Sequence, residues 1–352
     1  MDRAVANPPR VSMSVVLENV HKSFGADRAV AGVDAEIATG EFFCVLGASG
    51  CGKSTLLRLI AGLEMADQGR IALGGQTMSG PDRHVPPEDR RTGFVFQSYA
   101  LWPHLSVRDN VAFPGEAQGL GKAEARRQAM DHLETVSLTG FADRKPAALS
   151  GGQRQRVALA RCLAGGARTI LMDEPLANLD PHLRAVMEEE LTRFHRASGV
   201  TTVYITHDQR EAMAVADRVA VMEKGRFLQV GTPREIYERP ANAAVARFIG
   251  RGTLVPVTVD GGRATVNGHS VAVDGEPADG PATAFIRPEH VTLGNAGGME
   301  GRVGAALYRG GHWEATVLLP GIEPPVQATS TEPLAAGEPV RVAFDKAWVL
   351  PA

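Results

Sequence analysis

The segment from residue 47 to residue 54 combines glycines, a lysine and a serine at a spacing suited to binding phosphate. Its sequence, Gly-Ala-Ser-Gly-Cys-Gly-Lys-Ser, fits the P-loop pattern G-x-x-x-x-G-K-[ST]. Glycines let backbone amides turn toward phosphate oxygens, and a following helix N-terminus adds a favourable dipole. Lys53 would then neutralise the β- and γ-phosphates, and the Ser54 hydroxyl would bind Mg²⁺. The sequence therefore predicts a nucleotide site made of Gly47, Ala48, Ser49, Gly50, Cys51, Gly52, Lys53, Ser54 and Thr55.

A second segment, residues 170–174, is an apolar run that ends in the carboxylates Asp173 and Glu174. A buried strand of a parallel sheet projects its last residues at the edge where a P-loop also opens. Asp173 would hold Mg²⁺ through a water molecule, and Glu174 would polarise the water that attacks the phosphate. A solvated acidic strand end is the alternative, and the P-loop upstream favours the catalytic interpretation.

These two segments leave kinases, GTPases and many ATPases open, and residues 149–153 narrow the choice. Their sequence, Leu-Ser-Gly-Gly-Gln, begins a basic amphipathic helix and resembles the signature of ATP-binding cassette (ABC) ATPases. Ser150 and the amides of the glycines can form a second anion site at the helix N-terminus. The resemblance implies binding to the γ-phosphate of ATP held by a partner subunit's P-loop, through Leu149, Ser150, Gly151, Gly152 and Gln153.

Four single residues match further positions of this family. Gln97 matches the glutamine expected near Mg²⁺ and the attacking water, and His207 matches the switch histidine expected at the γ-phosphate. Phe24 occupies the position where an aromatic ring stacks on adenine, with a core phenylalanine as the alternative. Asp180 matches the D-loop aspartate of the stretch 176–180, in which Ala177 replaces the common serine. The resemblance thus implies ATP and Mg²⁺ as cofactors, a catalytic set of Gln97, Glu174 and His207, and a metal set of Ser54, Gln97 and Asp173.

A narrower resemblance involves residues 98–105 and the tail segment 285–290 (Phe-Ile-Arg-Pro-Glu-His). Both are similar to importer ATPases of the iron, polyamine, sulfate and sugar group, whose C-terminal module is the TOBE domain. The resemblance implies that Gln97–Leu105 receives a short helix of a membrane permease. Exposed Tyr99, Trp102 and Pro103 would suit such a socket, and a core position is the alternative for Trp102.

The pattern of short β-type runs and helical segments predicts how these residues are positioned. Residues 14–245 are expected to form an α/β P-loop fold with a mostly parallel sheet, interrupted by a helical subdomain at about 98–165. Residues 251–352 predict a small all-β barrel or sandwich, with the boundary at 245–252, and the resemblance to the TOBE domain implies that it is OB-like. In the α/β part, an alternating strand is expected at 15–20 and buried strands at 41–46, 169–172 and 201–206. A helix is expected at 54–63, helical segments near 106–112, 122–137 and 152–165, a hairpin at 219–230, and a helix capped by Asp180 that continues to about 197.

Composition excludes several classes of protein. The 352 residues carry 37 basic and 40 acidic side chains, and a net charge of −3 lacks the basic field of a nonspecific nucleic-acid binder. No apolar run approaches the about 18 residues needed to span a bilayer, and residues 1–11 lack the apolar core of a signal peptide. Three cysteines at unpaired spacings fit neither a disulfide framework nor a zinc site, so a reducing compartment is expected.

We therefore predict an ATPase subunit of a bacterial ABC importer, located peripherally at the cytoplasmic face of the inner membrane. It would act as a homodimer with two sandwiched ATPs, drive permease subunits, serve a periplasmic solute-binding protein and bind no nucleic acid. The segment 99–104 favours ferric iron as the solute, with polyamine or phosphonate as alternatives. An exporter ATPase, a soluble cassette ATPase of the repair or translation type, and a regulatory module that only binds ATP are competing interpretations. Glu174 and His207 argue against the last of these, and the TOBE-like tail argues against the exporter.

Overall fold

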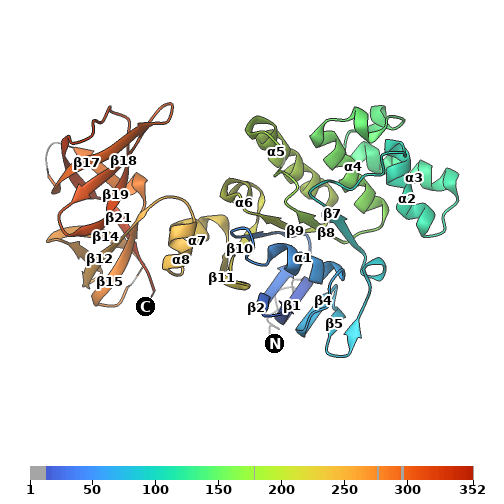
Figure 1. The fold of residues 1–352 in the computed structure, drawn as a ribbon, viewed down its shortest axis with the longest axis horizontal. Coiled ribbons are helices and arrows are strands. Elements are labelled where there is room, and N and C mark those ends of the chain that lie inside the picture. Colours follow the sequence, from blue (N-terminus) through green and yellow to red (C-terminus); the bar gives the residue numbers. More distant parts are fainter. Residues whose placement is uncertain (1–12, 178, 276, 295–296, 352) are drawn as a thin grey trace, which may run out of the picture. The chain divides into compact units, whose positions relative to one another are not determined.

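The computed structural model describes residues 13–177, 179–275, 277–294 and 297–351. Residues 1–11 and Asn178, on which predictions above partly fall, lie outside these ranges. The chain forms two compact units that divide between Pro233 and Arg234, and Figure 1 labels their elements. We describe each unit by itself.

The first unit is built on a six-stranded, mostly parallel sheet with the strand order β11-β10-β3-β9-β8-β7. Only the β10–β11 pair is antiparallel. The strands are β3 (Phe42–Leu46), β7 (Thr92–Val95), β8 (Thr169–Asp173), β9 (Thr201–Thr206), β10 (Arg218–Glu223) and β11 (Arg226–Gly231). All residues of β3 and β9 are buried, as expected for central strands covered on both faces. The predicted parallel sheet, its buried strands and the hairpin are confirmed.

A second, antiparallel sheet with the order β2-β1-β4-β5-β6 was not predicted beyond the strand at 15–20. Its strands are β1 (Met13–Phe24), β2 (Asp27–Ala38), β4 (Gln68–Leu73), β5 (Gln76–Gly80) and β6 (Arg83–His84). Helix α1 (Lys53–Ala61) places Leu56, Leu57, Leu59 and Ile60 in one hydrophobic cluster with residues of both sheets. This packing fixes the start of α1, which directly follows the P-loop.

The predicted helical segment lies between β7 and β8 and contains α2 (Val107–Ala117), α3 (Lys122–Thr135) and α4 (Gly151–Ala164). In Figure 1 these helices lie together beyond the β7 edge of the sheet, away from α1. Helix α5 (Pro181–Ser198) follows β8, and the short α6 (Gln209–Val215) follows β9. The Asp180 carboxylate accepts the amides of His182 and Leu183, which confirms the predicted cap of α5.

The second unit contains a closed barrel and a five-stranded sheet, which confirms the predicted all-β module. The barrel order is β12-β13-β14-β21-β15, and the sheet order is β16-β20-β17-β18-β19. The strands are β12 (Thr253–Asp260), β13 (Arg263–Val266), β14 (His269–Asp274), β15 (Gly280–Ile286), β16 (Val291–Gly294), β17 (Met299–Tyr308), β18 (Trp313–Leu319), β19 (Ile322–Ser330), β20 (Pro339–Phe344) and β21 (Lys346–Val349). Alternating buried residues of β12 pack into a cluster shared by barrel and sheet.

The division between the units precedes the boundary expected at 245–252, because two short helices, α7 (Pro233–Glu238) and α8 (Ala243–Phe248), are held to the barrel. The buried guanidinium of Arg287 donates hydrogen bonds to the carbonyls of Tyr237, Ile249 and Arg251. It also lies 3.8 Å from the centre of the Tyr237 ring. Burial lowers the pKa of Arg287. One side chain of the barrel therefore fastens the segment that the sequence pattern assigns to the first domain.

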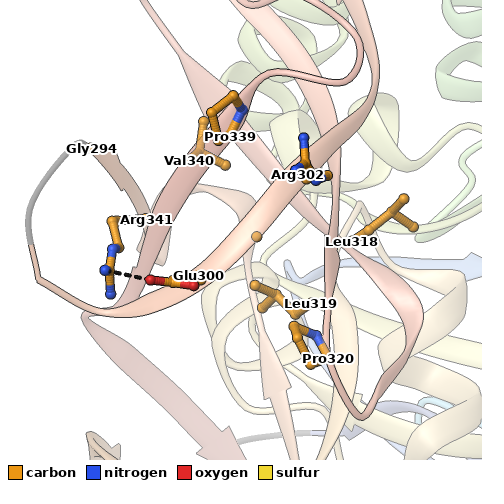
Figure 2. A pocket seen from close by; sticks show the side chains of 10 residues that line it. Gly294, Glu300, Arg302, Leu318, Leu319, Pro320, Pro339, Val340 and Arg341 are labelled. Atoms are coloured by element: carbon orange, nitrogen blue, oxygen red, sulfur yellow. Dashed lines mark hydrogen bonds and ion pairs between the residues drawn. The ribbon is translucent and has the colours of Figure 1, made fainter.

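The five-stranded sheet carries a surface hollow of about 750 Å³ over β17, β18 and β20 (Figure 2). Arg341 pairs with Glu300 at 2.6 Å, and Arg302 donates to the Gly337 carbonyl, while Leu318 and Val340 supply apolar surface. The arginine side chains that line this hollow thus already form an ion pair or a hydrogen bond within the chain. None of the helices in the described residues is long and apolar enough to cross a membrane.

Arg287→Ala should lower the free energy of unfolding of the second unit by about 3 kcal/mol, because three carbonyls lose the hydrogen bonds donated by one buried guanidinium. Arg341→Ala is the matched control, since it removes an exposed ion pair worth less than about 1 kcal/mol. Chemical denaturation followed by tryptophan fluorescence compares the two variants. Equal stability losses would contradict the anchoring role of Arg287.

Candidate functional site

The P-loop lies between β3 and α1, as its pattern predicts. The buried Lys53 Nζ donates hydrogen bonds to the carbonyls of Gly47 and Ala48, at 2.8 and 3.1 Å. It also lies 3.8 Å from Glu174 Oε1. Ala48, Ser49 and Gly50 are exposed at the loop surface, and Ser54 and Thr55 lie in the first turn of α1. The loop thus curls around a single buried cation.

Two glycines of the loop occupy positions that a side chain could not fill. Gly52 has a φ of 109°, and a Cβ there would lie 2.0 Å from the Ala29 carbonyl oxygen. A Cβ at Gly47 would lie 2.4 Å from the Met222 carbonyl oxygen. Because Gly52 is also the N-cap of α1, no side chain caps the first amides of this helix. Those amides are therefore a site that an anion can occupy.

The loop is also hydrogen-bonded to the turn between β10 and β11. The Gly225 amide donates to the Cys51 carbonyl at 2.9 Å, and the Gly225 carbonyl accepts from the Ala31 amide at 2.9 Å. The Cys51 thiol is nearly buried, and burial raises its pKa. Cys51 therefore acts as a packed spacer in this structure, consistent with a loop held from both sides.

Ser54 and Asp173, both predicted at the metal, are brought together. The Ser54 hydroxyl donates to Asp173 Oδ1 at 3.2 Å. Burial raises the pKa of Asp173, and the Ser54 hydrogen bond opposes this shift. Hydroxyl and carboxylate oxygens suit Mg²⁺, which keeps several waters and takes further oxygens from phosphates. Among the described residues no cluster of three or more His, Cys, Asp or Glu forms a metal cage, so the donor set fits an ion shared with a bound phosphate.

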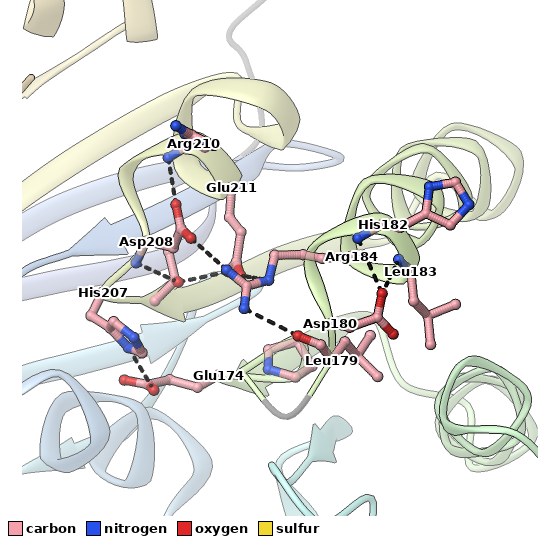
Figure 3. A network of polar contacts seen from close by, with 12 residues as sticks. Glu174, Leu179, Asp180, His182, Leu183, Arg184, His207, Asp208, Arg210 and Glu211 are labelled. Atoms are coloured by element: carbon pink, nitrogen blue, oxygen red, sulfur yellow. Dashed lines mark hydrogen bonds and ion pairs between the residues drawn. The ribbon is translucent and has the colours of Figure 1, made fainter. Parts of the chain in front are cut away.

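Glu174 and His207 are also brought together, because β8 and β9 are parallel neighbours. His207 Nδ1 lies 2.9 Å from Glu174 Oε2, as Figure 3 shows. Glu174 has a positive φ of 44°, and its amide donates to the Ile205 carbonyl at 3.1 Å. Positive φ is uncommon for a residue other than glycine, so the backbone here is held in an unfavourable conformation. The pair can hold and polarise a water molecule beside the P-loop lysine.

Gln97 and Phe24 are both accessible to a ligand. Gln97 is exposed and follows β7, the parallel neighbour of β8, by two residues. The Phe24 side chain is 50% exposed, and Lys22 Nζ lies 5.2 Å from the centre of its ring. This exposure excludes the alternative that Phe24 is a core residue. Their contacts with nucleotide remain predictions.

The residues 149–153 lie apart from the P-loop group. Leu149 is buried, Ser150 caps α4, and Ser150 and Gln153 exchange two hydrogen bonds in a capping box. A Cβ at Gly152 would lie 2.4 Å from Met187 Sδ, so α4 packs closely against α5. Figure 1 shows α4 with α2 and α3, away from α1, the helix that begins at Lys53. Asp180 likewise serves as the cap of α5.

The expectation of an exposed Tyr99 is wrong. Tyr99 is only 6% exposed, and its hydroxyl donates to the Pro175 carbonyl at 3.1 Å. Arg161 donates to the carbonyls of Tyr99 and Ala100 and lies over the ring of Trp102. Trp102 is partly buried against Phe113, so the core alternative holds in part for Trp102. Pro103 is exposed, as expected.

Sequence reasoning missed Arg184, Asp208 and Glu211, which form a polar network beside His207 (Figure 3). A signal was present in the spacing of charges. An arginine follows the Asp180 cap by four residues, and acids follow His207 by one and four residues. Opposite charges at these positions near two predicted site segments favour an ion pair between the segments.

Comparison with known proteins agrees with the geometry. Residues 30–177 match the family described as ABC transporter, and residues 284–350 match the TOBE domain. The chain is 45% identical to the Fe(3+) ions import ATP-binding protein FbpC of Agrobacterium fabrum over 86% of this chain and 87% of that protein. It is 43% identical to the sn-glycerol-3-phosphate import ATP-binding protein UgpC of Rhizobium meliloti, over 93% and 89% of the two chains. It is 39% identical to the spermidine/putrescine import ATP-binding protein PotA of Marinobacter nauticus, over 94% and 93%.

Solved structures show the same fold. A dimeric structure of the ATP-binding cassette MJ0796 bound to ADP and Pi is 33% identical, with a TM-score of 0.54 over 62% of this chain and 99% of that chain. The protein cbiO1 of Clostridium perfringens, described as part of the ABC transporter complex cbiONQ, is 28% identical, with a TM-score of 0.59 over 67% and 94%. The α/β fold with a P-loop is therefore confirmed.

Gly52→Ala should destabilise the first unit by about 3 kcal/mol or more, because its Cβ would overlap the Ala29 carbonyl oxygen. Gly50→Ala is the control, since Gly50 has a similar positive φ of 81° but open space around it. Gly50→Ala should lower the free energy of unfolding by only about 1–2 kcal/mol, which is the cost of holding an alanine in the left-handed conformation. Urea denaturation measures both variants, and a Gly52→Ala protein as stable as Gly50→Ala would contradict the close approach.

Proposed function

The chain belongs to the ATP-binding proteins of ABC transporters and is an import ATPase, and from this premise we propose that it energises the uptake of ferric iron. The observation that carries the ATPase assignment is the group formed by Lys53, Glu174 and His207 around the P-loop. The iron assignment is supported by similarity to Fe(3+) import proteins, of which one from Agrobacterium fabrum is 45% identical.

The site residues divide the work of hydrolysis among them. The uncapped amides of α1 and the Lys53 ammonium bind the phosphates, and the exposed ring of Phe24 stacks on adenine. Ser54, Gln97 and Asp173 would hold Mg²⁺, which would neutralise charge on the β- and γ-phosphates. Glu174 orients and polarises the attacking water, and His207, at 2.9 Å from Glu174, faces the γ-phosphate.

A second copy of the chain completes each site. Ser150 caps α4, and α4 lies away from α1, the helix that follows the chain's own P-loop, so the anion site at the start of α4 is available to the ATP of a partner subunit. The D-loop residue Asp180 lies at the same dimer interface. Closure on two ATPs and opening after hydrolysis then move the membrane subunits between two states. The homologous cassette MJ0796 was solved as a dimer.

The permease binds at Gln97–Leu105, on a surface that includes other apolar side chains. Phe96 and Phe113 are exposed, and Phe113 packs on the ring of Trp102. Exposed aromatic side chains next to a rigid support suit the docking of a short helix. The chain thus lies at the cytoplasmic face of the bacterial inner membrane, and a periplasmic binding protein delivers the solute. A polyamine or phosphonate importer is the alternative, since a relative is named for spermidine and putrescine.

Glu174→Gln should retain ATP binding and lower kcat by about 100-fold or more, because a neutral amide polarises water poorly. With ATP and Mg²⁺ the variant should elute from gel filtration as a dimer. Glu189→Gln, an exposed position on α5, is the control and should match the wild type. Lys53→Ala should lose ATP binding itself. Wild-type turnover in Glu174→Gln would overturn the catalytic assignment.

Deletion of the gene should abolish uptake of radiolabelled ferric iron supplied with its binding protein, because the permease would lack its ATPase. The wild-type gene should restore uptake, and the Lys53→Ala gene should not. Spermidine and phosphonate uptake are measured in the same cells. Normal iron uptake with loss of another solute would refute the iron assignment and leave the ATPase assignment intact.

A further inference from the structure

Arg184 links two segments of the catalytic site that are far apart in the sequence. It lies in α5, four residues after the Asp180 cap. Its Nη1 lies 2.7 Å from Asp208 Oδ2, its Nε lies 3.5 Å from Glu211 Oε1, and its Nη2 donates to the Leu179 carbonyl at 3.2 Å (Figure 3). One planar guanidinium therefore joins the segment between Glu174 and Asp180 to the segment that follows His207.

The carboxylate of Glu211 depends on this arginine. Glu211 is 2% exposed, and its Oε2 accepts hydrogen bonds from Tyr204 at 2.7 Å and Thr206 at 2.6 Å. A buried carboxylate needs a countercharge as well as hydrogen bonds. Arg184 is the cation that lies against it. Both hydroxyl partners belong to β9, the strand that ends immediately before His207.

Asp208, the residue next to His207, is held by hydrogen bonds in the same way as Glu211. Its amide donates to Thr206 Oγ1 at 3.0 Å, and its side chain caps α6 by accepting the Arg210 amide at 2.8 Å. The other carboxylate oxygen receives Arg184. With β9 and α6 tied on either side of His207, the backbone that carries the imidazole has little freedom, and Arg184 ties this network to α5.

We propose that Arg184 is a positioning residue, which holds His207 against Glu174 and makes this pair follow any movement of Leu179 and α5. The inference rests on the proposed ATPase function and deepens it. A change in the position of Leu179 or α5 would reach His207 through the guanidinium, since its three ties come from both segments. A lysine can keep the charge but cannot bind all three partners as a rigid fork.

The test separates turnover from binding. Arg184→Ala and Arg184→Lys should each lower kcat for ATP by about tenfold or more, because misplacement of a catalytic group by an ångström is costly. The Kd for a fluorescent ATP analogue should change less than about twofold, because Arg184 does not touch the P-loop residues that bind phosphate. Arg193→Ala is the control on the same helix, where an exposed arginine pairs with Glu190, and it should behave as the wild type.

A double-mutant cycle tests whether Arg184 acts through His207. Arg184→Lys combined with His207→Ala should turn over no more slowly than His207→Ala alone in single-turnover assays. Equal losses in both backgrounds, or a wild-type kcat in Arg184→Lys, would overturn the proposal. Arg184→Lys also decides the matter if Arg184→Ala fails to fold, because it keeps a cation beside Glu211. A wild-type chain that hydrolyses no ATP would instead refute the proposed function.

Discussion

The parallel pairing of β3, β9 and β8 determines where every charged group of the site lies. Leu46 pairs with Thr206 and Ile205 with Asp173, so Gly47, His207 and Glu174 each emerge one residue beyond a strand end at one edge of the sheet. The Glu174 amide is held by the Ile205 carbonyl, and the Gly47 amide by the Thr206 carbonyl at 3.4 Å. A slip of one residue in either pairing would turn the alternate side chains and separate Lys53 from Glu174.

Local patterns predicted most of this site. The P-loop, the acidic end of β8 and the cap at Asp180 depend on short-range spacing, which the sequence displays directly. The burial of Tyr99 was missed because its hydroxyl bonds to Pro175, a residue far along the chain. The antiparallel sheet was missed because bulges interrupt the register between β1 and β2 and weaken the alternation of apolar residues along these strands. The compact units divide before the predicted boundary at 245–252, because Arg287 holds Tyr237 and Ile249 to the second unit.

Helix α5 receives contacts from both functional regions of the first unit. Gly152 of the signature segment packs against Met187, and a Cβ at Gly151 would lie 2.9 Å from the side chain of Leu179. The same helix carries Arg184, which reaches Asp208 beside the switch histidine. The small size of the two signature glycines is therefore needed for packing as well as for anion binding. Substitutions there would alter the position of α5 even where no nucleotide is involved.

The hydrogen bonds of Gly225 give the fold a mechanical property. The turn at Gly225 holds the P-loop through the Cys51 carbonyl, and β11, which starts from this turn, leads at Gly231 into the link to the second unit. The β10–β11 hairpin thus acts as a tether with the nucleotide loop near its fixed end. Tension on the link is borne first by the β10–β11 pairing and only then by the Gly225–Cys51 bond. Under such tension the two strands of the hairpin would separate before the P-loop itself is deformed.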